Sequence, residues 1–287
     1  MNGPSSSSLF HFTSELSFLK DLLLRGFRYS YSYEIFPQAI IRNEITKYQK
    51  TFYYSSSRQN DAVAIPMICF CDIPLLRITQ HCSKYGNYAI GIDKEMARTI
   101  YGSMLNPIHY LSSSNDYISL SDISVIKELD IPGCHNLHTS VNNLIALSKP
   151  YAGTIMDDGK CCFYDEREWR IYLPDESDTP YSWKWNIHFD KRNDFKLWRN
   201  PLNDDLDASE FGRLSLVKGK ELSKIDEENL INFFTHFIVR SEKEVEEIVN
   251  LLLDEKNTIF GYTNISPMSR HLLVSKVSSM ARIKIDF

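Results

Sequence analysis

The sequence has no apolar run long enough to cross a membrane, and it opens without a recognisable export signal. Apolar runs such as 22–24 and 251–253 are far shorter than the ~20 residues of a membrane-spanning helix. Residues 1–8 contain neither the basic segment nor the apolar segment of a secretory signal. We therefore expect a cytoplasmic protein that does not engage a membrane.

A strong excess of positive charge is also absent. The 287 residues carry a formal net charge of −5, so contact with nucleic acid would need a local basic patch. With 43% hydrophobic and 24% charged residues, the composition is that of a globular protein of one large domain or two small ones. The aromatic content of 13% favours packing that is rich in β-structure.

The spacing of a structural zinc site is missing as well, although the chain has six cysteines. The two groups that include histidine are Cys69-x-Cys71 with His81-Cys82, and Cys134-His135 with His138. Neither group shows the C-x₂-C or H-x₃₋₅-H spacing that closes a tetrahedral site. We interpret the cysteines as buried or incidental thiols, with no metal bound; a metal site stays the alternative.

The composition changes along the chain and indicates how it is organised. Residues 1–8 are rich in serine and are expected to form a flexible tail. Residues 9–287 are predicted to form a single domain, with a polar and aromatic insertion at about 176–215. Within it, residues 183–199 interleave Trp and Phe with Lys and Arg, a mix that suits single-stranded nucleic acid. An aromatic loop kept soluble by its lysines is the alternative.

Hydrophobic periodicity and capping signals predict both strands and helices. Strands are predicted at 9–13, 62–72, 88–92, 108–110, 162–173 and 237–239, and helical stretches at 38–50 and 121–149. A further helix is expected from Ser14 to Gly26, with leucines 16, 19 and 23 on one face. Ser241 and Glu244 have the spacing of a capping box, which indicates another helix after the last strand.

The segment Asp-Glu-Arg-Glu-Trp-Arg-Ile-Tyr at 165–172 carries the densest group of ionisable residues on a predicted strand. A period of two places Glu166, Glu168, Arg170 and Tyr172 on one face of that strand. Carboxylates beside a guanidinium are a plausible catalytic surface, because neighbours of mixed sign decide which group stays ionised. The alternative is a structural strand face closed by ion pairs.

Several segments together resemble the AbiGi family of abortive-infection phage-resistance proteins. They are Leu-Phe-His-Phe-Thr (9–13), Pro-Met-Ile-Cys-Phe-Cys-Asp-Ile-Pro-Leu (66–75), Tyr-Gly-Asn-Tyr-Ala-Ile-Gly-Ile (85–92), Asn-Pro (106–107) and Glu-Arg-Glu-Trp-Arg (166–170). The likeness extends over most of the chain, apart from residues 176–215. Its motifs are specific in combination and weak singly.

The same layout is similar to the ADP-ribosyltransferase fold of nucleic-acid-modifying toxins. That resemblance implies an α+β fold whose strands form two packed, mostly antiparallel sheets, a split core surrounded by helices. It implies an NAD site in which His11-Phe12-Thr13 holds the donor, with His11 on the ribose hydroxyls and Thr13 on the nicotinamide side. Carried over by position, the remaining roles are stacking on nicotinamide by Phe70 or Tyr88, pyrophosphate contact by Arg28 or Arg170, and catalysis by Glu168 beside Glu166. His11 and Glu168 are then expected to face one cleft.

The function expected from these resemblances is that of an NAD-dependent ADP-ribosyltransferase toxin of an anti-phage system. RNA or single-stranded DNA is the expected acceptor, and the family context implies an antitoxin protein as partner. Cleavage of the nicotinamide bond develops positive charge on the ribose, which a carboxylate such as Glu168 can stabilise. The alternative is a non-catalytic module of the same fold that binds or regulates a partner in a toxin–antitoxin system.

Overall fold

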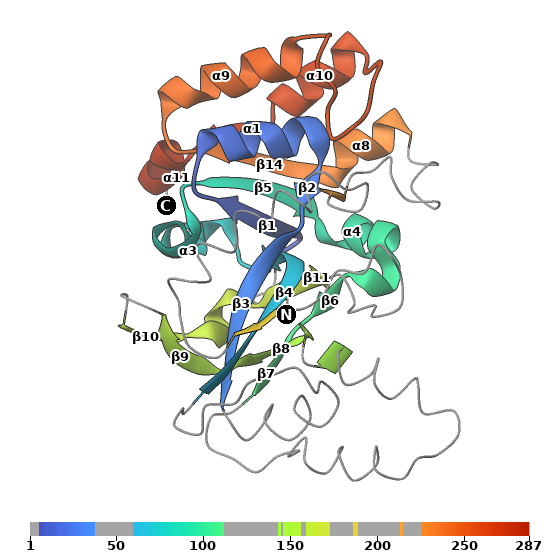
Figure 1. The fold of residues 1–287 in the computed structure, drawn as a ribbon. Coiled ribbons are helices and arrows are strands. Elements are labelled where there is room, and N and C mark those ends of the chain that lie inside the picture. Colours follow the sequence, from blue (N-terminus) through green and yellow to red (C-terminus); the bar gives the residue numbers. More distant parts are fainter. Residues whose placement is uncertain are drawn as a thin grey trace, which may run out of the picture.

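The computed structural model describes residues 6–37, 60–111, 143–144, 146–155, 159–172, 186–188, 213–214 and 226–286. Its centre is a nine-stranded sheet in the order β15-β14-β5-β1-β4-β11-β6, with β3 and β12 also paired to β4 (Figure 1). The strands are β1 (Ser8–Thr13), β3 (Ser30–Pro37), β4 (Asn60–Cys71), β5 (Tyr88–Asp93), β6 (Asn106–Pro107), β11 (Glu168–Tyr172), β12 (Asn186–His188), β14 (Phe234–Val239) and β15 (Val277–Ser279). All pairs in this sheet are antiparallel except β14 with β15.

Short strands and helices surround this sheet. Three two-stranded pairs accompany it: β2 (Phe27–Arg28) with β13 (Arg213–Leu214), β7 (His109–Leu111) with β8 (Ser148–Pro150), and β9 (Ala152–Ile155) with β10 (Gly159–Cys162). The α-helices are α1 (Leu16–Arg25), α3 (Ile78–Tyr85), α4 (Lys94–Tyr101), α8 (Glu227–Phe233), α9 (Glu242–Leu253), α10 (Pro267–Val274) and α11 (Met280–Asp286). The 3₁₀-helices are η1 (Leu75–Arg77), η2 (Gly102–Met104) and η3 (Phe163–Glu166).

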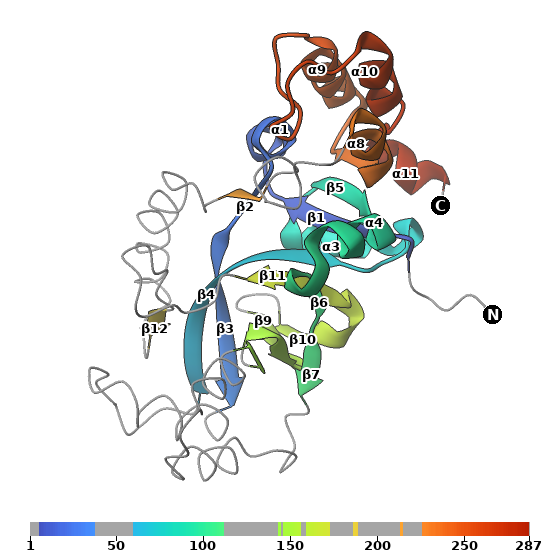
Figure 2. The same cartoon turned by 90° about the vertical axis from the view of Figure 1, so that its right-hand side faces the viewer.

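The alternation of side chains along the strands gives the sheet two apolar faces. On β1, Leu9 faces a large core that contains leucines of α1, Leu230 and Phe233 of α8, and the apolar stripe of α9. Phe10, its neighbour, faces a smaller core with Ile78 of α3 and Met280 of α11. Helices therefore cover both faces, and both views show α1, α9 and α10 at one end and β7 to β10 at the other (Figures 1 and 2).

The sheet is nearly divided between β1 and β4. These strands share only the pair Phe10↔Cys71, whereas β1 pairs with β5 along its whole length, from Ser8 to Thr13. Among the described residues the nine-stranded sheet is mostly antiparallel and has helices on both faces, and the split core of two packed sheets implied by the resemblance stays a prediction. The mixed α/β class and the antiparallel pairing are confirmed.

Several local predictions from sequence are confirmed. The strand and helix at the start of the chain form as β1 and α1, and Gly26 ends α1 at a φ of 96° that favours glycine. The capping box is present: Ser241 and Glu244 bond each other's backbone at the start of α9, whose residues Ile248 and Leu252 are buried. These elements depend on local signals, which explains why the sequence predicts them.

Other local predictions from sequence were wrong, or concern residues outside the described ranges. Glu15, and not Ser14, occupies the N-cap position of α1, while Ser8 already belongs to β1. Residues 148 and 149, expected to be helical, belong to strand β8. The helical prediction at 38–50 lies outside the described residues, as do most of 121–149 and of the insertion at 176–215.

Candidate functional site

The charged segment at 165–172 is not one continuous strand. Residues 163–166 form η3, Arg167 adopts a left-handed conformation with φ of 44°, and β11 begins only at Glu168. The Arg167 N–H donates to the Tyr164 carbonyl, and the Arg167 carbonyl accepts from the Asp72 N–H, at 3.2 and 3.1 Å. The prediction of a single strand from 162 to 173 was therefore wrong, because this turn interrupts the alternation between Glu166 and Glu168.

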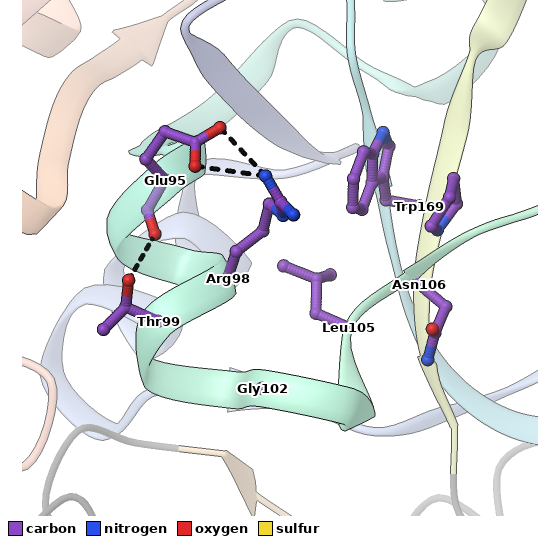
Figure 3. Close-up of a pocket in the computed structure, with 8 residues that line it drawn as sticks. Glu95, Arg98, Thr99, Gly102, Leu105, Asn106 and Trp169 are labelled. Atoms are coloured by element: carbon purple, nitrogen blue, oxygen red, sulfur yellow. Dashed lines mark hydrogen bonds and ion pairs between the residues drawn. The ribbon is translucent and has the colours of Figure 1, made fainter.

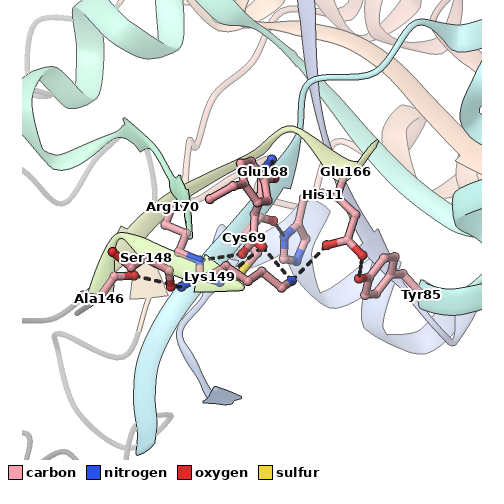
Figure 4. Close-up of polar contacts among 10 residues, drawn as sticks. His11, Cys69, Tyr85, Ala146, Ser148, Lys149, Glu166, Glu168 and Arg170 are labelled. Atoms are coloured by element: carbon pink, nitrogen blue, oxygen red, sulfur yellow. Dashed lines mark hydrogen bonds and ion pairs between the residues drawn. The ribbon is translucent and has the colours of Figure 1, made fainter. Parts of the chain in front are cut away.

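Glu168 nevertheless meets the charges that the sequence suggested, in the interior of the protein. The Arg170 side chain donates from Nε to Oε1 at 2.6 Å and from Nη2 to Oε2 at 3.2 Å. Lys149, on β8, donates from Nζ to Oε2 at 2.9 Å (Figure 4). Glu168 is only 5% exposed and Arg170 is wholly buried. Both carboxylate oxygens of Glu168 are thus occupied by protein donors.

Lys149 joins this pair to the second carboxylate of the segment. Its Nζ also donates to Glu166 Oε2 at 2.9 Å, and the Tyr85 hydroxyl donates to Glu166 Oε1 at 2.5 Å. The Arg170 Nη1 donates in turn to the Ala146 carbonyl at 2.8 Å. We call Tyr85, Lys149, Glu166, Glu168 and Arg170 the carboxylate network. It ties β11 and η3 to β8 and to the end of α3 (Figure 4).

The electrostatics of the network favour a permanently ionised Glu168. Burial alone would raise the pKa of Glu168, but the charges of Arg170 and Lys149 outweigh it and hold that pKa well below its ordinary value. The pKa of Tyr85 is raised, first by burial and then by the negative charge of Glu166, so its hydroxyl stays protonated. A carboxylate that binds protons this weakly is a poor general base near neutral pH, though it can still stabilise positive charge.

This lowered pKa predicts how acid affects the stability of the fold. An unfolded glutamate titrates near ~4.3, so the stabilisation from Glu168 is complete above that pH and is lost as pH falls toward the lower folded pKa. Wild type should therefore lose free energy of unfolding below about pH 4.3 more steeply than Glu168→Gln, by up to about 1.4 kcal/mol per pH unit. Urea unfolding between pH 2.5 and 7 measures this difference. His11, His81 and His236, whose pKa values burial lowers, affect both proteins alike. Parallel curves for the two proteins would contradict the assignment.

His11 lies on β1 and is half-buried against aromatic rings. Its ring centroid lies 5.2 Å from that of Phe27 and 5.8 Å from that of Phe70, and its Nδ1 lies 2.8 Å from the Cys69 carbonyl oxygen. Burial lowers the pKa of His11, which favours the neutral ring. Because a carbonyl only accepts, Nδ1 must carry the proton, and Nε2 then holds a lone pair that can accept from a hydroxyl.

His11 and Glu168 both touch Cys69 but leave the sheet on opposite faces. His11 bonds the Cys69 carbonyl, while the Cys69 thiol hydrogen-bonds the Glu168 carboxylate. The pairs Phe10↔Cys71 and Glu168↔Cys71 place Glu168 on the face of Phe10, and His11 points the other way. That the two side chains face one cleft therefore stays a prediction.

The structure places the other candidate NAD-binding residues in mostly buried positions. Phe70 is wholly buried and Tyr88 is 4% exposed, with its hydroxyl on Glu244 at 2.9 Å, so neither ring offers a face for stacking on nicotinamide. Arg170 commits its guanidinium to Glu168 and to backbone carbonyls and cannot also meet a pyrophosphate. These three assignments therefore do not fit this conformation of the protein.

Three further candidates are only partly buried. Phe12 stacks on the ring of His81 with centroids 6.2 Å apart, and Thr13 ends β1 opposite Tyr88. Arg28, on β2, is half-buried and follows Phe27, which contacts His11. Their roles toward NAD stay predictions.

A cluster of tyrosines lies beside the network and was not suggested by the sequence. The rings of Tyr151 and Tyr164 stack with centroids 5.4 Å apart, and Tyr110 meets Tyr164 edge-on at 5.3 Å. Tyr151 and Tyr164 are each 47% exposed. The Tyr110 hydroxyl accepts from the Glu168 N–H at 2.8 Å, and Lys149 Nζ lies 4.7 Å from the Phe163 ring centroid. We call Tyr110, Tyr151 and Tyr164 the tyrosine surface.

Two other features of the sequence can be placed only in part. Among the described residues, no three His, Cys, Asp or Glu side chains gather as a metal site would need, and Cys134, His135 and His138 lie outside them. The basic and aromatic segment at 183–199 is described only for the backbone of β12. No helix in the described ranges has the length and apolarity needed to cross a bilayer.

Comparison with known protein families identifies the family of this chain. A sequence model with the description "Putative abortive phage resistance protein AbiGi, antitoxin" matches residues 38–195. This chain belongs to the AbiGi family. The AbiGi match spans β4 to β11, including the whole carboxylate network and the tyrosine surface, but it begins after His11.

The chain is also similar to a known protein of a lactococcal strain. The chain is 29% identical over 151 residues to "Abortive phage resistance protein AbiGi" of Lactococcus lactis subsp. cremoris, covering 44% of this chain and 59% of the relative. The chain thus spans about three fifths of the length of this relative. No solved structure matches the chain.

Proposed function

We propose that this AbiGi-family protein is the antitoxin of an abortive-infection system, and that it neutralises a toxin protein by binding it. The description of the family supports this proposal, as do the hydrogen bonds that Glu166 and Glu168 accept within the protein. The observation that carries it is that all four carboxylate oxygens of Glu166 and Glu168 accept hydrogen bonds from donors within the protein. Carboxylates held in this way brace a structure more readily than they perform chemistry on a ligand.

The network braces a surface that a protein partner could recognise. Lys149 reaches Glu166, the last residue of η3, and lies two residues before Tyr151. The Tyr164 N–H, within η3, donates to the Tyr151 carbonyl at 3.2 Å. The network thereby fixes the two backbone segments that carry the exposed, stacked rings.

Rigid, exposed tyrosines are typical of the residues that dominate protein–protein binding energy. A tyrosine offers a large apolar ring at a small entropic cost, and its hydroxyl remains available for a hydrogen bond. At the tyrosine surface two such rings are already ordered by stacking, so little further ordering is needed when a partner binds. We therefore place the toxin contact there.

A growth experiment separates an antitoxin from a toxin. The chain is expressed alone, and then together with the protein encoded beside it, under independent promoters. The proposal predicts normal growth with this chain alone, growth arrest with the neighbouring protein alone, and recovery when both are expressed. Growth arrest caused by this chain alone would contradict the proposal.

The tyrosine surface should control neutralisation. The double variant Tyr151→Ala/Tyr164→Ala should weaken binding of the neighbouring toxin by about 2 kcal/mol or more, which is roughly 30-fold, because both contact rings are removed. Phe18→Ala is the matched control, since this aromatic residue of α1 is also half-exposed, at 46%. Binding of each purified variant to the immobilised toxin gives the two affinities. Equal loss in both variants would show that toxin binding does not depend on this surface.

NAD-dependent ADP-ribosyl transfer to RNA or single-stranded DNA is the second candidate function. The protonation state of His11 is compatible with it, because the neutral ring presents Nε2 as an acceptor for a ribose hydroxyl, although His11 and Glu168 leave the sheet on opposite faces. In this reading Glu168 would stabilise the positive charge that develops as nicotinamide leaves. The basic residues of 183–199 would guide the acceptor.

Labelled NAD tests this second candidate directly. The protein is incubated with labelled NAD and total cellular RNA, DNA or protein, and transfer of label is measured. If the candidate is correct, label enters nucleic acid, Glu168→Gln abolishes transfer while NAD binding persists, and His11→Ala weakens NAD binding. Absence of label with wild-type protein in all three mixtures would reject it.

A further inference from the structure

An open pocket lies on the far side of β11 from the carboxylate network. Its volume is about 540 Å³, within the range of ~300–1,000 Å³ that is usual for small-molecule sites. Its lining residues are Glu95, Arg98, Thr99, Gly102, Leu105, Asn106, Pro107 and Trp169 (Figure 3). All eight lie within the segment that matches the AbiGi family, and none belongs to the network or to the tyrosine surface.

The pocket is built where α4 turns through η2 into β6. The register pairs Trp169 with Pro107, so the indole and the Asn-Pro dipeptide stand on adjacent strands. Gly102 makes the turn with a positive φ of 54°, and a Cβ at that position would meet nothing within 4 Å. The rim is thus open at Gly102, and the opposite wall is aromatic (Figure 3). Trp169 and Asn-Pro are motifs of the sequence that the proposed function leaves without a role.

The walls offer three kinds of contact that are complementary to one ligand. Arg98 points across the pocket toward the Trp169 indole, and its hydrogen bonds to Glu95, at 3.1 and 3.2 Å, use only Nη1 (Figure 3). The Asn106 amide donates from Nδ2 to the Ser103 carbonyl at 2.6 Å, which leaves Oδ1 as an acceptor. Lys94, which does not line the pocket, holds its Nζ 5.7 Å from the centroid of the Trp169 ring and donates to Asp72 Oδ2 at 2.9 Å. The Trp169 ring and the Arg98 guanidinium therefore border the same space, and Asn106 lies at its edge (Figure 3).

We propose that this pocket binds a nucleotide unit, with the base stacked at Trp169 and the phosphate at Arg98. An indole stacks on any base, a guanidinium is suited to phosphate, and an amide oxygen can accept from an exocyclic amine. The unit belongs either to a free nucleoside monophosphate or to a single-stranded RNA. This inference does not depend on the antitoxin assignment and can fail without affecting it.

Calorimetric titration of the full chain distinguishes the two sources. The probes are AMP, GMP, CMP and UMP, a ten-nucleotide single-stranded RNA of mixed sequence, and ribose 5-phosphate as a probe without a base. A free-nucleotide site binds at least one monophosphate with an affinity similar to or better than that of the RNA. An RNA site binds the oligonucleotide more tightly, with an affinity that falls as salt rises, by about 0.7 in log–log slope per phosphate contacted. Ribose 5-phosphate binds weakly in either case.

Three variants test the two contacts. Trp169→Leu should weaken binding by about ten-fold or more, whereas Trp169→Phe, which keeps a ring, should retain most of it. Arg98→Met should weaken binding several-fold and reduce its dependence on salt. Arg25→Met is the matched control, because Arg25 is also an exposed arginine paired with a helix neighbour, Asp21. Since Arg98 is exposed, its variant should fold normally even if Trp169→Leu does not.

Three results would contradict a nucleotide site in this pocket. If no monophosphate and no RNA binds at millimolar concentration, the pocket is not a nucleotide site. Nucleotide binding that is unchanged in both Arg98→Met and Trp169→Leu would place the ligand elsewhere. Binding of ribose 5-phosphate as tight as that of the nucleotides would show a phosphate site without a base contact.

Discussion

Glu168→Gln is expected to lower the free energy of unfolding by about 3–5 kcal/mol at pH 7. The substitution keeps the size of the side chain but leaves Arg170 buried without its anionic partner. Lys149 keeps Glu166, so part of the network survives. Urea unfolding followed by circular dichroism measures the change. Glu95→Gln is the control: its ion pair with Arg98 is exposed, and its loss should cost less than about 1 kcal/mol.

A double-mutant cycle assigns this loss to the pair itself. Arg170→Met alone should also destabilise strongly, since Glu168 would keep only Lys149 and the Cys69 thiol, and the Ala146 carbonyl would lose a donor. Glu168→Gln combined with Arg170→Met should cost clearly less than the sum of the two single changes, because removing both charges leaves neither unpaired. Strictly additive losses would show that the two side chains do not depend on each other.

Gly86→Ala should be about as damaging, for a steric reason. Gly86 has a φ of 109°, and a Cβ there would lie 2.1 Å from the Thr13 carbonyl oxygen and 2.5 Å from Ser14 Cα. Both contacts are with backbone, so no side chain can move away. Strain and overpacking together should cost about 3–5 kcal/mol, and the end of β1 should separate from the α3–β5 turn. Thermal unfolding of the variant gives the measurement.

Gly102→Ala is the matched control for that effect. Gly102 also has a positive φ, of 54°, but its Cβ position is open. Only the conformational cost remains, about 1–2 kcal/mol. If the two alanine variants were equally stable, close approach of β1 to Gly86 would not be a requirement of the fold.

The sequence predicts best where structure is decided locally. The order of β1 and α1, the stop at Gly26 and the capping box at Ser241 and Glu244 all follow from neighbouring residues. The position of β4 follows from its apolar run. The missed strand β3 has no such signal, because the serines of 30–37 resemble a loop and their pairing with β4 is supplied by the rest of the fold.

The candidate site was predictable only in part, for a similar reason. Glu168 and Arg170 are two residues apart on a strand, so the alternation of a strand is enough to pair them. Lys149 and Tyr85 come from β8 and α3, and only the folded chain brings them to Glu166. Nor can the sequence show that this charged face is buried. Burial removes Arg170 from reach of a ligand and changes the interpretation from chemistry to bracing.

The central proposal is that Glu168 and Arg170 stabilise the fold and take part in no chemical step, whereas Lys149 and Glu166 hold the tyrosine surface. Neutralisation of the neighbouring toxin by Glu168→Gln/Arg170→Met tests it most directly, at a temperature where circular dichroism shows the variant to be folded. The account predicts that the folded variant, although it lacks the candidate catalytic carboxylate, rescues growth and binds the toxin within a few-fold of wild type. A folded variant that binds the toxin normally but fails to rescue growth would contradict the account, because Glu168 would then act chemically.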